Sequence, residues 1–179
     1  MSYKTILTVL TTPANTATQL EQTISLTRQV DGHADALCLG VDRTQTGYYY
    51  AGANAMVLQE TMTRAKEDAT ALQAYADDYL TKAGVPFASD SGIAQVADMG
   101  RHVARMARFS DLVVLGQPYG NGKGVEAEPV VESALFEGRT PVLVVPDDAD
   151  PVGQPKTVLV AWNESVEAMT SIRKAMPFL

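Results

Sequence analysis

The sequence predicts an α/β fold: an open, doubly wound sheet of five parallel strands with helices on both faces. Short runs rich in Val, Ile and Leu alternate along the chain with longer amphipathic stretches of helical period. The apolar runs do not alternate with polar residues, which is typical of parallel strands covered on both faces. The chain has 179 residues, 46% of them hydrophobic, enough to bury one good core. Such an alternation favours right-handed crossovers between parallel strands.

Four short apolar runs are the predicted strands, and a weaker run is the fifth. The four are residues 6–11, 36–41, 112–116 and 142–145, and the weaker one is 85–88. Strands between two helix layers have no polar face, so their apolar side chains should be nearly inaccessible to water. The residues expected there are Leu7, Val9, Leu39, Val113, Leu115, Leu143 and Val145.

Helical patterns fill the intervals between these strands. Thr12 is a suitable N-cap with Pro13 at the first helical position, so the first helix should begin there. The longest helix is predicted over residues 53–82 and ends at Gly84, which suits a left-handed cap. Two shorter apolar stripes predict the third and fourth helices: Val96, Met99, Val103 and Met106, then Val130, Ala134 and Leu135.

Composition and charge exclude several classes of partner. The net charge of −7 and the absence of any Lys/Arg run leave no footprint for nucleic acid or an anionic membrane surface. No stretch approaches the roughly 18 apolar residues of a membrane span, and the N-terminus does not match a signal peptide. Cys38 is the single cysteine and lies in an apolar run, so a buried thiol and a reducing compartment are expected. We therefore expect a cytoplasmic protein.

No arrangement of catalytic or metal-ligating residues stands out. His33 is expected in a turn and His102 on a helix face, and their spacing does not make a metal pair. Arg101, Arg105 and Arg108 recur at helical spacing, either as an anion-binding stripe or, as we prefer, as a solvated helix face. The sequence therefore predicts neither a metal site nor an enzyme.

The candidate ligand site is the glycine-rich loop QPYGNGKG that follows the run 112–116. In open α/β sheets, ligands bind beyond the carboxyl ends of strands where the topology reverses. The loop is close to a Walker A loop, but Gln117 replaces its leading glycine and Gly124 replaces the Ser/Thr that would hold magnesium. A surface loop without a ligand is the alternative. Residues 48–50, three tyrosines on the same edge, would cap a ligand or partner or simply pack over a neighbouring helix.

Three segments together resemble the universal stress protein family: YKTILTVLTT near the start, DLVVLG before the glycine loop, and VESALFEGRTPVLVVP. The resemblance covers residues 3–146 and implies the fold of the adenine nucleotide alpha hydrolase-like domains. After the linker, the segment KTVLVAWNESVEAMTSIRKAMPFL resembles the start of a second such domain, which makes an internal repeat. The expected organisation is therefore a domain over 1–146, a linker over 147–156, and a partial second domain over 157–179 consisting of a strand and a helix.

ATP-binding members of that family carry a G-x2-G-x9-G-[ST] loop and an aspartate at the end of the first strand, and this sequence departs from both. Gly116 matches the first glycine, but five residues separate it from Gly122. Glu132 stands in place of the last glycine, while Ser133 keeps the hydroxyl. Thr11 takes the position of the aspartate. With these five, a further three loop residues complete the candidate degenerate nucleotide site: Gly120, Lys123 and Gly124.

Because the glycine loop departs from the pattern of the ATP-binding members, we predict a stress-response module that acts by protein association and needs no cofactor. Glu126 and Glu128 lie near the start of the fourth helix, where they would stand in for a phosphate. The alternative is a stress protein that binds ATP or AMP through the loop 116–124 and Ser133. Weak hydrolysis of ATP is the third hypothesis. It ranks last because no residue of the sequence suggests a general base.

The C-terminal segment predicts a partner for the chain. Residues 157–162 form an apolar run, and Val166, Met169, Ile172 and Ala175 form an apolar helical stripe. Left exposed, both would promote aggregation. Because members of the resembled family pair through their last strands, we expect a homodimer formed by the edge strand 141–145 or by the tail. The alternative is a monomer in which the tail covers its own edge strand.

Overall fold

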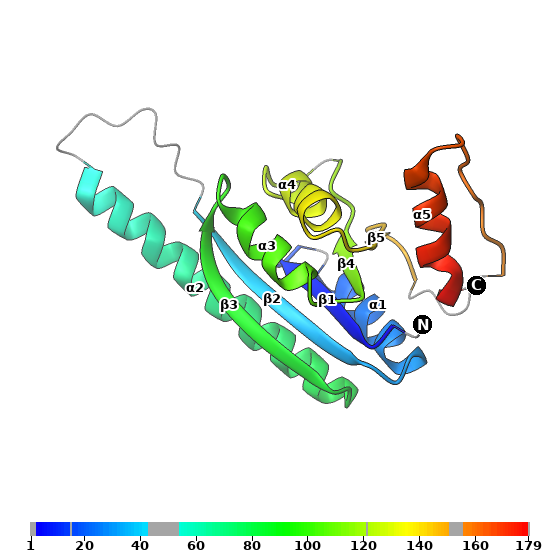
Figure 1. The fold of residues 1–179 in the computed structure, drawn as a ribbon. Helices are drawn as coiled ribbons and strands as arrows, with labels where there is room; N and C mark the ends of the chain where they lie inside the picture. Colours follow the sequence, from blue (N-terminus) through cyan, green and yellow to red (C-terminus); the bar gives the residue numbers. More distant parts are fainter. Residues whose placement is uncertain (1–2, 15, 43–53, 121, 151–155, 179) are drawn as a thin grey trace.

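The computed structural model describes residues 3–178 except 15, 43–53, 121 and 151–155. Its centre is a five-stranded sheet of order β3-β2-β1-β4-β5, in which all neighbouring strands run parallel. The strands are β1 (Thr5–Leu10), β2 (His33–Asp42), β3 (Phe87–Gln95), β4 (Leu112–Gly116) and β5 (Val142–Val145). Figure 1 shows the sheet with helices on both faces. The predicted doubly wound parallel α/β fold is confirmed.

Two pairs of helices form the outer layers. The helices are α1 (Thr16–Gln29), α2 (Asn54–Ala83), α3 (Met99–Ala107) and α4 (Ala127–Glu132), which continues as the π-helix η2 (Ser133–Glu137). α1 and α2 contact each other and cover one face, whereas α3 contacts α4 and η2 on the other. Within the described residues, no helix combines the length and the apolar character needed to cross a membrane.

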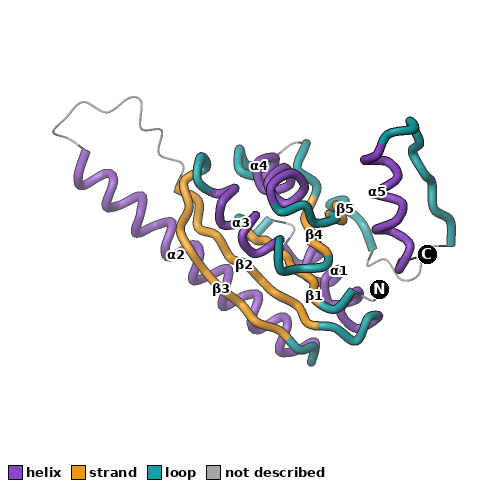
Figure 2. Tube along the Cα trace, viewed as in Figure 1, coloured by secondary structure: helices purple, strands orange, loops and turns teal. Residues whose placement is uncertain are grey.

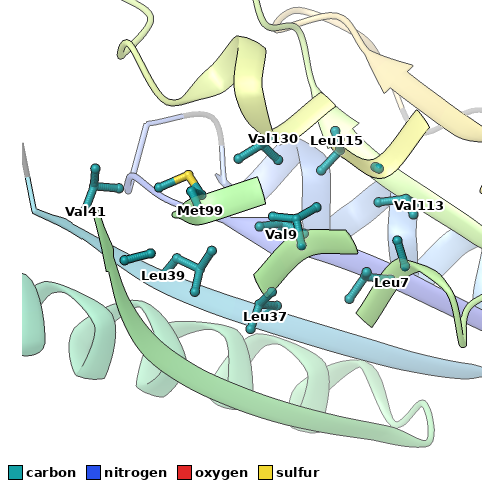
Figure 3. Packing of buried hydrophobic residues seen from close by; sticks show 13 residues of the cluster. Leu7, Val9, Leu37, Leu39, Val41, Met99, Val113, Leu115 and Val130 are labelled. Atoms are coloured by element: carbon teal, nitrogen blue, oxygen red, sulfur yellow. The ribbon is translucent and has the colours of Figure 1, made fainter. Parts of the chain in front are cut away.

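The alternating direction of strand side chains builds a core on each face of the sheet. On the face under α3 and α4, Leu7, Leu39 and Val113 pack with Met99 and other helix residues (Figure 3). On the opposite face, the neighbouring strand positions pack against α1 and α2. Of the side chains predicted to be inaccessible, six are buried: Leu7, Val9, Leu39, Val113, Leu115 and Val145.

The long helix α2 lies close against β2 because a glycine sits at the contact. A Cβ added to Gly40 would overlap the backbone carbonyl of Ala65 in α2. The helix ends as predicted, with Gly84 in the left-handed conformation at φ 67°. Gly40 therefore lets the helix backbone approach the strand directly.

Several element boundaries differ from the prediction. α1 begins at Thr16 and not at Pro13, because Thr12 forms a short turn in which its Oγ1 accepts from Ala14 N at 3.4 Å. β2 begins at His33, which is therefore a strand residue and not a turn residue. β3 covers Phe87–Gln95, whereas only 85–88 was predicted. β3 lies at the edge of the sheet with much of one side exposed, so its sequence lacks the apolar run of a central strand.

The opposite edge strand, β5, is less covered than predicted. Leu143 is only partly buried, and Val144 is 41% exposed. The prediction that Leu143 would be nearly inaccessible was wrong, because an edge strand has a neighbour on one side only. β5 thus presents unpaired backbone groups and apolar side chains along its free edge.

The C-terminal segment forms the predicted helix but not the predicted strand. Residues 157–162 have no strand structure and are drawn as loop in Figure 2. Leu159 in this run is 95% exposed. Helix α5 (Val166–Ala175) is capped by Ser165, whose Oγ accepts from Ala168 N at 3.0 Å, but it buries no residue. The strand prediction was wrong within this chain because a strand needs a neighbouring strand for its hydrogen bonds.

Candidate functional site

A cavity of about 210 Å³ opens at the carboxyl ends of β1 and β4. The chain runs outward from β1 to β2 and β3, then returns to place β4 on the other side of β1. This reversal is the position at which open α/β sheets bind ligands. Residues from both strand ends, from the glycine loop and from α4 line the cavity. The place predicted from the sequence thus holds a real cavity.

Gln19 of α1 forms the floor of the cavity by joining the two strand ends. The pairing of β1 with β4 ends at Thr8 and Val114. Beyond that point, the Gln19 Nε2 donates to Thr8 Oγ1 at 2.7 Å and to the Val9 carbonyl at 2.9 Å. Its Oε1 accepts from the Gly116 backbone N–H at 3.1 Å. Because a backbone N–H can only donate, these contacts fix the orientation of the buried amide.

The glycine loop needs glycine at two positions for its backbone. Gly120 has φ 123° and Gly122 has φ 80°, in the region that other residues rarely adopt. Gly122 lines the cavity, whereas Gly120 does not. Gln117, between the strand and these turns, donates from Nε2 to the Tyr119 carbonyl at 2.9 Å. In the described part of the loop, residues 117–120 and 122–124, this contact and the two glycine conformations define the backbone.

Lys123 lines the cavity but is paired within the chain. Its Nζ lies 2.5 Å from Asp147 Oδ1, and the two side chains are 16% and 31% exposed. Asp147 follows β5, so this ion pair joins the glycine loop to the end of the edge strand. The backbone contact from Gln117 N to the Val145 carbonyl, at 2.9 Å, ties the same two segments. The ammonium group is thus already neutralised by a carboxylate.

Glu126 places a buried carboxylate in the cavity wall. The residue is 1% exposed, and it precedes α4 without capping it through its side chain. A Cβ added to Gly124 would overlap the Glu126 carboxylate, so the carboxylate lies directly over the loop backbone. Glu128, two residues further along the chain, is exposed and accepts from Tyr119 Oη at 3.3 Å. The negative charge of Glu128 raises the pKa of Tyr119.

The structure brings together five of the eight residues predicted for the site. Thr11, Gly116, Gly122, Lys123 and Gly124 line the cavity. The other three, Gly120, Glu132 and Ser133, are not part of its lining.

The two residues at the end of α4 point elsewhere. Glu132 is exposed. Ser133 is buried against α3, where a Cβ added to Gly100 would lie 2.5 Å from the Ser133 Oγ. The hydroxyl that was expected to serve a phosphate therefore packs between two helices.

The other polar residues named from the sequence form no site in the described part of the chain. Arg101 pairs with Asp98 at 3.3 Å, and Arg108 Nε donates to the Glu137 carbonyl at 3.2 Å. No group of His, Cys, Asp and Glu within the described residues is arranged to hold a metal ion. The tyrosines of residues 48–50 lie outside the described residues.

The single cysteine is a core residue. Cys38 is fully buried in β2 and packs against α1 and α2. Burial, with smaller contributions from the negative charges of Asp77 and Asp90, raises the pKa of its thiol to about 12. The thiol is therefore protonated at neutral pH, as expected of a buried structural cysteine.

Solved structures of universal stress proteins share this fold. A protein of the universal stress protein family from Burkholderia pseudomallei is 20% identical, with a TM-score of 0.54 over 81% of this chain and 97% of its own. The universal stress protein UspA from Lactobacillus plantarum is 15% identical, with a TM-score of 0.57 over 81% and 99%. A universal stress protein family protein from Arabidopsis thaliana, solved with AMP bound, is 16% identical, with a TM-score of 0.50 over 86% and 96%.

These likenesses establish the fold that the sequence resemblance implied. No protein-family model matches the sequence, and no curated protein matches it either. The similarity is therefore one of three-dimensional arrangement, and the chemistry of the site has to be argued from the residues of this chain.

Proposed function

We propose that this chain is a stress-response module of the universal stress protein type that acts through protein association, with a nucleotide pocket that has lost its affinity for phosphate. One observation carries the proposal. The buried carboxylate of Glu126 lies over Gly124, on the backbone where a phosphate would have to approach. A phosphate and a carboxylate repel each other, and within a partly buried cavity this repulsion is strong.

The donors that a phosphate needs are occupied in the same cavity. The Gly116 N–H donates to Gln19, and the Lys123 ammonium pairs with Asp147. Ser133 packs against Gly100 and Thr11 carries no charge, so neither supplies the contact inferred from the resemblance. The cavity of about 210 Å³ is also smaller than the roughly 300–1,000 Å³ of typical small-molecule sites. These features together disfavour ordinary binding of ATP, and we propose neither a cofactor nor an enzymatic reaction.

Adenine-nucleotide binding is the second candidate, and the position of the cavity favours it. The cavity lies at the switch point of the sheet and is lined by three loop glycines, Gly116, Gly122 and Gly124. The similar Arabidopsis protein was solved with AMP bound. AMP carries less charge than ATP and would suffer less repulsion from Glu126.

Analysis of bound small molecules discriminates the two candidates. The protein is purified without added nucleotide and denatured, and the released molecules are identified by mass spectrometry. We expect no stoichiometric adenylate. Titration calorimetry with AMP and with Mg-ATP should show no binding in the micromolar range. A stoichiometric adenylate, or micromolar affinity for either nucleotide, would favour the second candidate and reject the first.

We also propose that two copies of the chain associate in the cytoplasm, with the tail as the start of a second, repeated domain. The exposed edge of β5, including Val144, and the exposed apolar run that contains Leu159 support association. A second copy of the chain could bury both surfaces, because unpaired strand edges and exposed apolar runs otherwise promote aggregation. Light scattering of the 179-residue chain tests this proposal, which predicts twice the monomer mass.

A further inference from the structure

We propose that an open groove between α1 and α2 binds a short zwitterion, in which an aliphatic chain joins an ammonium group to a carboxylate. The ammonium would contact Glu21 and the carboxylate would contact Arg28, and both residues line the groove. The groove has a volume of about 650 Å³ and shares no lining residue with the cavity at the ends of β1 and β4. It is therefore a separate site, which goes beyond the proposed function and does not depend on it.

The groove lies where α1 and α2 end. α1 ends at Gln29 and α2 at Ala83, and both of these residues line the groove. The two helices contact each other on the same face of the sheet (Figure 1). A few residues after each helix the next strand begins, β2 at His33 and β3 at Phe87. The groove thus lies at the edge where the strands begin, opposite the edge that holds the cavity.

Glu21 and Arg28 offer two opposite charges that the chain leaves without a counter-charge. Both residues are exposed, so a ligand in the groove can reach them. They lie two turns apart on one face of α1, about 10 Å along the helix axis, and are therefore too far apart to pair with each other. Among the described residues, neither of them forms an ion pair. Lys82, the third charged residue of the lining, is already paired with Asp78 at 2.7 Å.

Contacts with α2 hold both charged groups in place. Tyr79 Oη donates to Glu21 Oε1 at 2.6 Å, and the second carboxylate oxygen remains to accept from a ligand. Arg28 Nη2 donates to the Ala83 carbonyl at 2.5 Å. A guanidinium has five N–H donors, and the others on Arg28 have no partner among the described residues. Because both side chains are already positioned, they lose less conformational freedom when a ligand binds.

Apolar surface lies along the groove beside the two charges. Ile24, which lies between Glu21 and Arg28 on the same face of α1, is 5% exposed and closes the floor. Tyr79 and Ala83, both partly buried, add apolar surface from α2. An aliphatic chain placed on this surface would leave water, which favours binding. A ligand with both charges and such a chain therefore fits the groove better than a ligand with one charge.

An NMR titration of the isotope-labelled 179-residue chain tests the site with probes of equal length. The probe 6-aminohexanoate carries both charges, 6-aminohexanol only the ammonium and 6-hydroxyhexanoate only the carboxylate. Free glycine carries both charges but has no chain to span two helical turns. We expect 6-aminohexanoate to bind at millimolar concentration, at least about threefold more tightly than each other probe, which is the gain typical of an exposed charge contact. The amide signals that shift should be those of the groove.

Two variants each remove one charge and keep a polar side chain. Glu21→Gln should weaken binding of 6-aminohexanoate at least about threefold without weakening 6-hydroxyhexanoate. Arg28→Gln should weaken 6-aminohexanoate by a similar factor without weakening 6-aminohexanol. Glu67→Gln is the matched control, because Glu67 is an exposed residue of α2 that does not line the groove. Circular dichroism verifies folding, and if Arg28→Gln does not fold, Glu21→Gln and the four probes still decide.

Preferential binding of 6-aminohexanoate that is lost in Glu21→Gln and kept in Glu67→Gln would support the zwitterion site. Three results would overturn it: no binding of 6-aminohexanoate at millimolar concentration, equal affinity for the probes with a single charge, or an equal loss in Glu67→Gln. None of these results bears on phosphate binding or on the association of two copies. Mass spectrometry of bound molecules and light scattering test those proposals separately.

Discussion

Replacing Gln19 by Leu should destabilise the sheet at its switch point, because this one amide joins the ends of β1 and β4. The substitution nearly preserves the volume of the side chain but removes every polar contact. The Gly116 N–H loses its acceptor, and the Val9 carbonyl and Thr8 Oγ1 each lose a donor. Thr8 Oγ1 still donates to the Val114 carbonyl at 3.1 Å, so part of the network survives.

The expected loss is dominated by the two backbone groups that lose their partner, the partly buried Gly116 N–H and the buried Val9 carbonyl. A buried polar group without a partner costs about 1–3 kcal/mol, and the loss of the remaining contacts brings the total to about 2–4 kcal/mol. For a chain of this size, each kcal/mol lowers the melting temperature by about 2–4 °C. The variant should therefore melt about 4–16 °C below the parent. Urea unfolding followed by circular dichroism at 222 nm gives the free energy directly.

Gln29→Leu is the matched control for this prediction. Gln29 lies on the exposed side of the same helix, and its Nε2 donates to Ser25 Oγ at 3.3 Å. We expect this surface change to alter stability by no more than about 0.5 kcal/mol. Thr8→Val combined with Gln19→Leu should lose less than the sum of the single changes, because the two side chains share a hydrogen bond. If Gln19→Leu is as stable as Gln29→Leu, the side chain does not join the strands.

Four further predictions follow from burial and exposure. Val113→Asp places a charge at a fully buried position of β4 and should cost several kcal/mol, so its urea midpoint should fall sharply; an unchanged midpoint would contradict a sheet covered on both faces. Cys38 should react with iodoacetamide at neutral pH only when guanidinium chloride unfolds the chain, because burial raises the pKa of the thiol to about 12; rapid labelling of the folded protein, followed by mass spectrometry, would show that the thiol is accessible. Since that pKa is raised from 9.0, the contribution of Cys38 to stability should be complete below pH 9 and decline as the pH rises toward 12. Truncation after Asp150 should convert the expected dimer to a monomer in light scattering if the exposed tail forms the interface; a dimer that survives truncation would assign the interface to β5.

Local pattern was sufficient to predict most of the fold. β4 and β5 occupy the predicted residues, and α2 differs from its prediction by a single residue at each end. These elements are predictable because their burial requires a recognisable pattern of apolar residues. A central strand needs a continuous apolar run, and an amphipathic helix needs apolar residues at helical spacing. The glycine loop was also predictable from its glycines, because Gly120 and Gly122 adopt positive φ angles that other residues rarely adopt.

Edges and exposed segments could not be assigned in the same way. β3 extends to Gln95 through polar residues because pairing with β2, rather than apolar burial, holds it. The run 157–162 has the composition of a central strand, yet it stays unpaired in this chain because strand structure depends on a neighbour that sequence pattern does not supply. Local composition shows how much apolar surface a segment can bury. The tertiary structure determines whether a neighbouring strand or helix is present to pack against that surface.

The sequence by itself determined where a ligand site should lie, and the tertiary structure decided its chemistry. The apolar run 112–116 and the glycines after it placed the site at the carboxyl end of a strand. Only the folded chain brings Gln19 to the Gly116 N–H, Asp147 to Lys123, and the Glu126 carboxylate over Gly124. Only the packing of η2 against Gly100 of α3 turns Ser133 away from the cavity. The physical reason is that these contacts join residues of different elements, whose mutual positions follow from packing and hydrogen bonding across the sheet, whereas the period of a sequence encodes only the burial of each element.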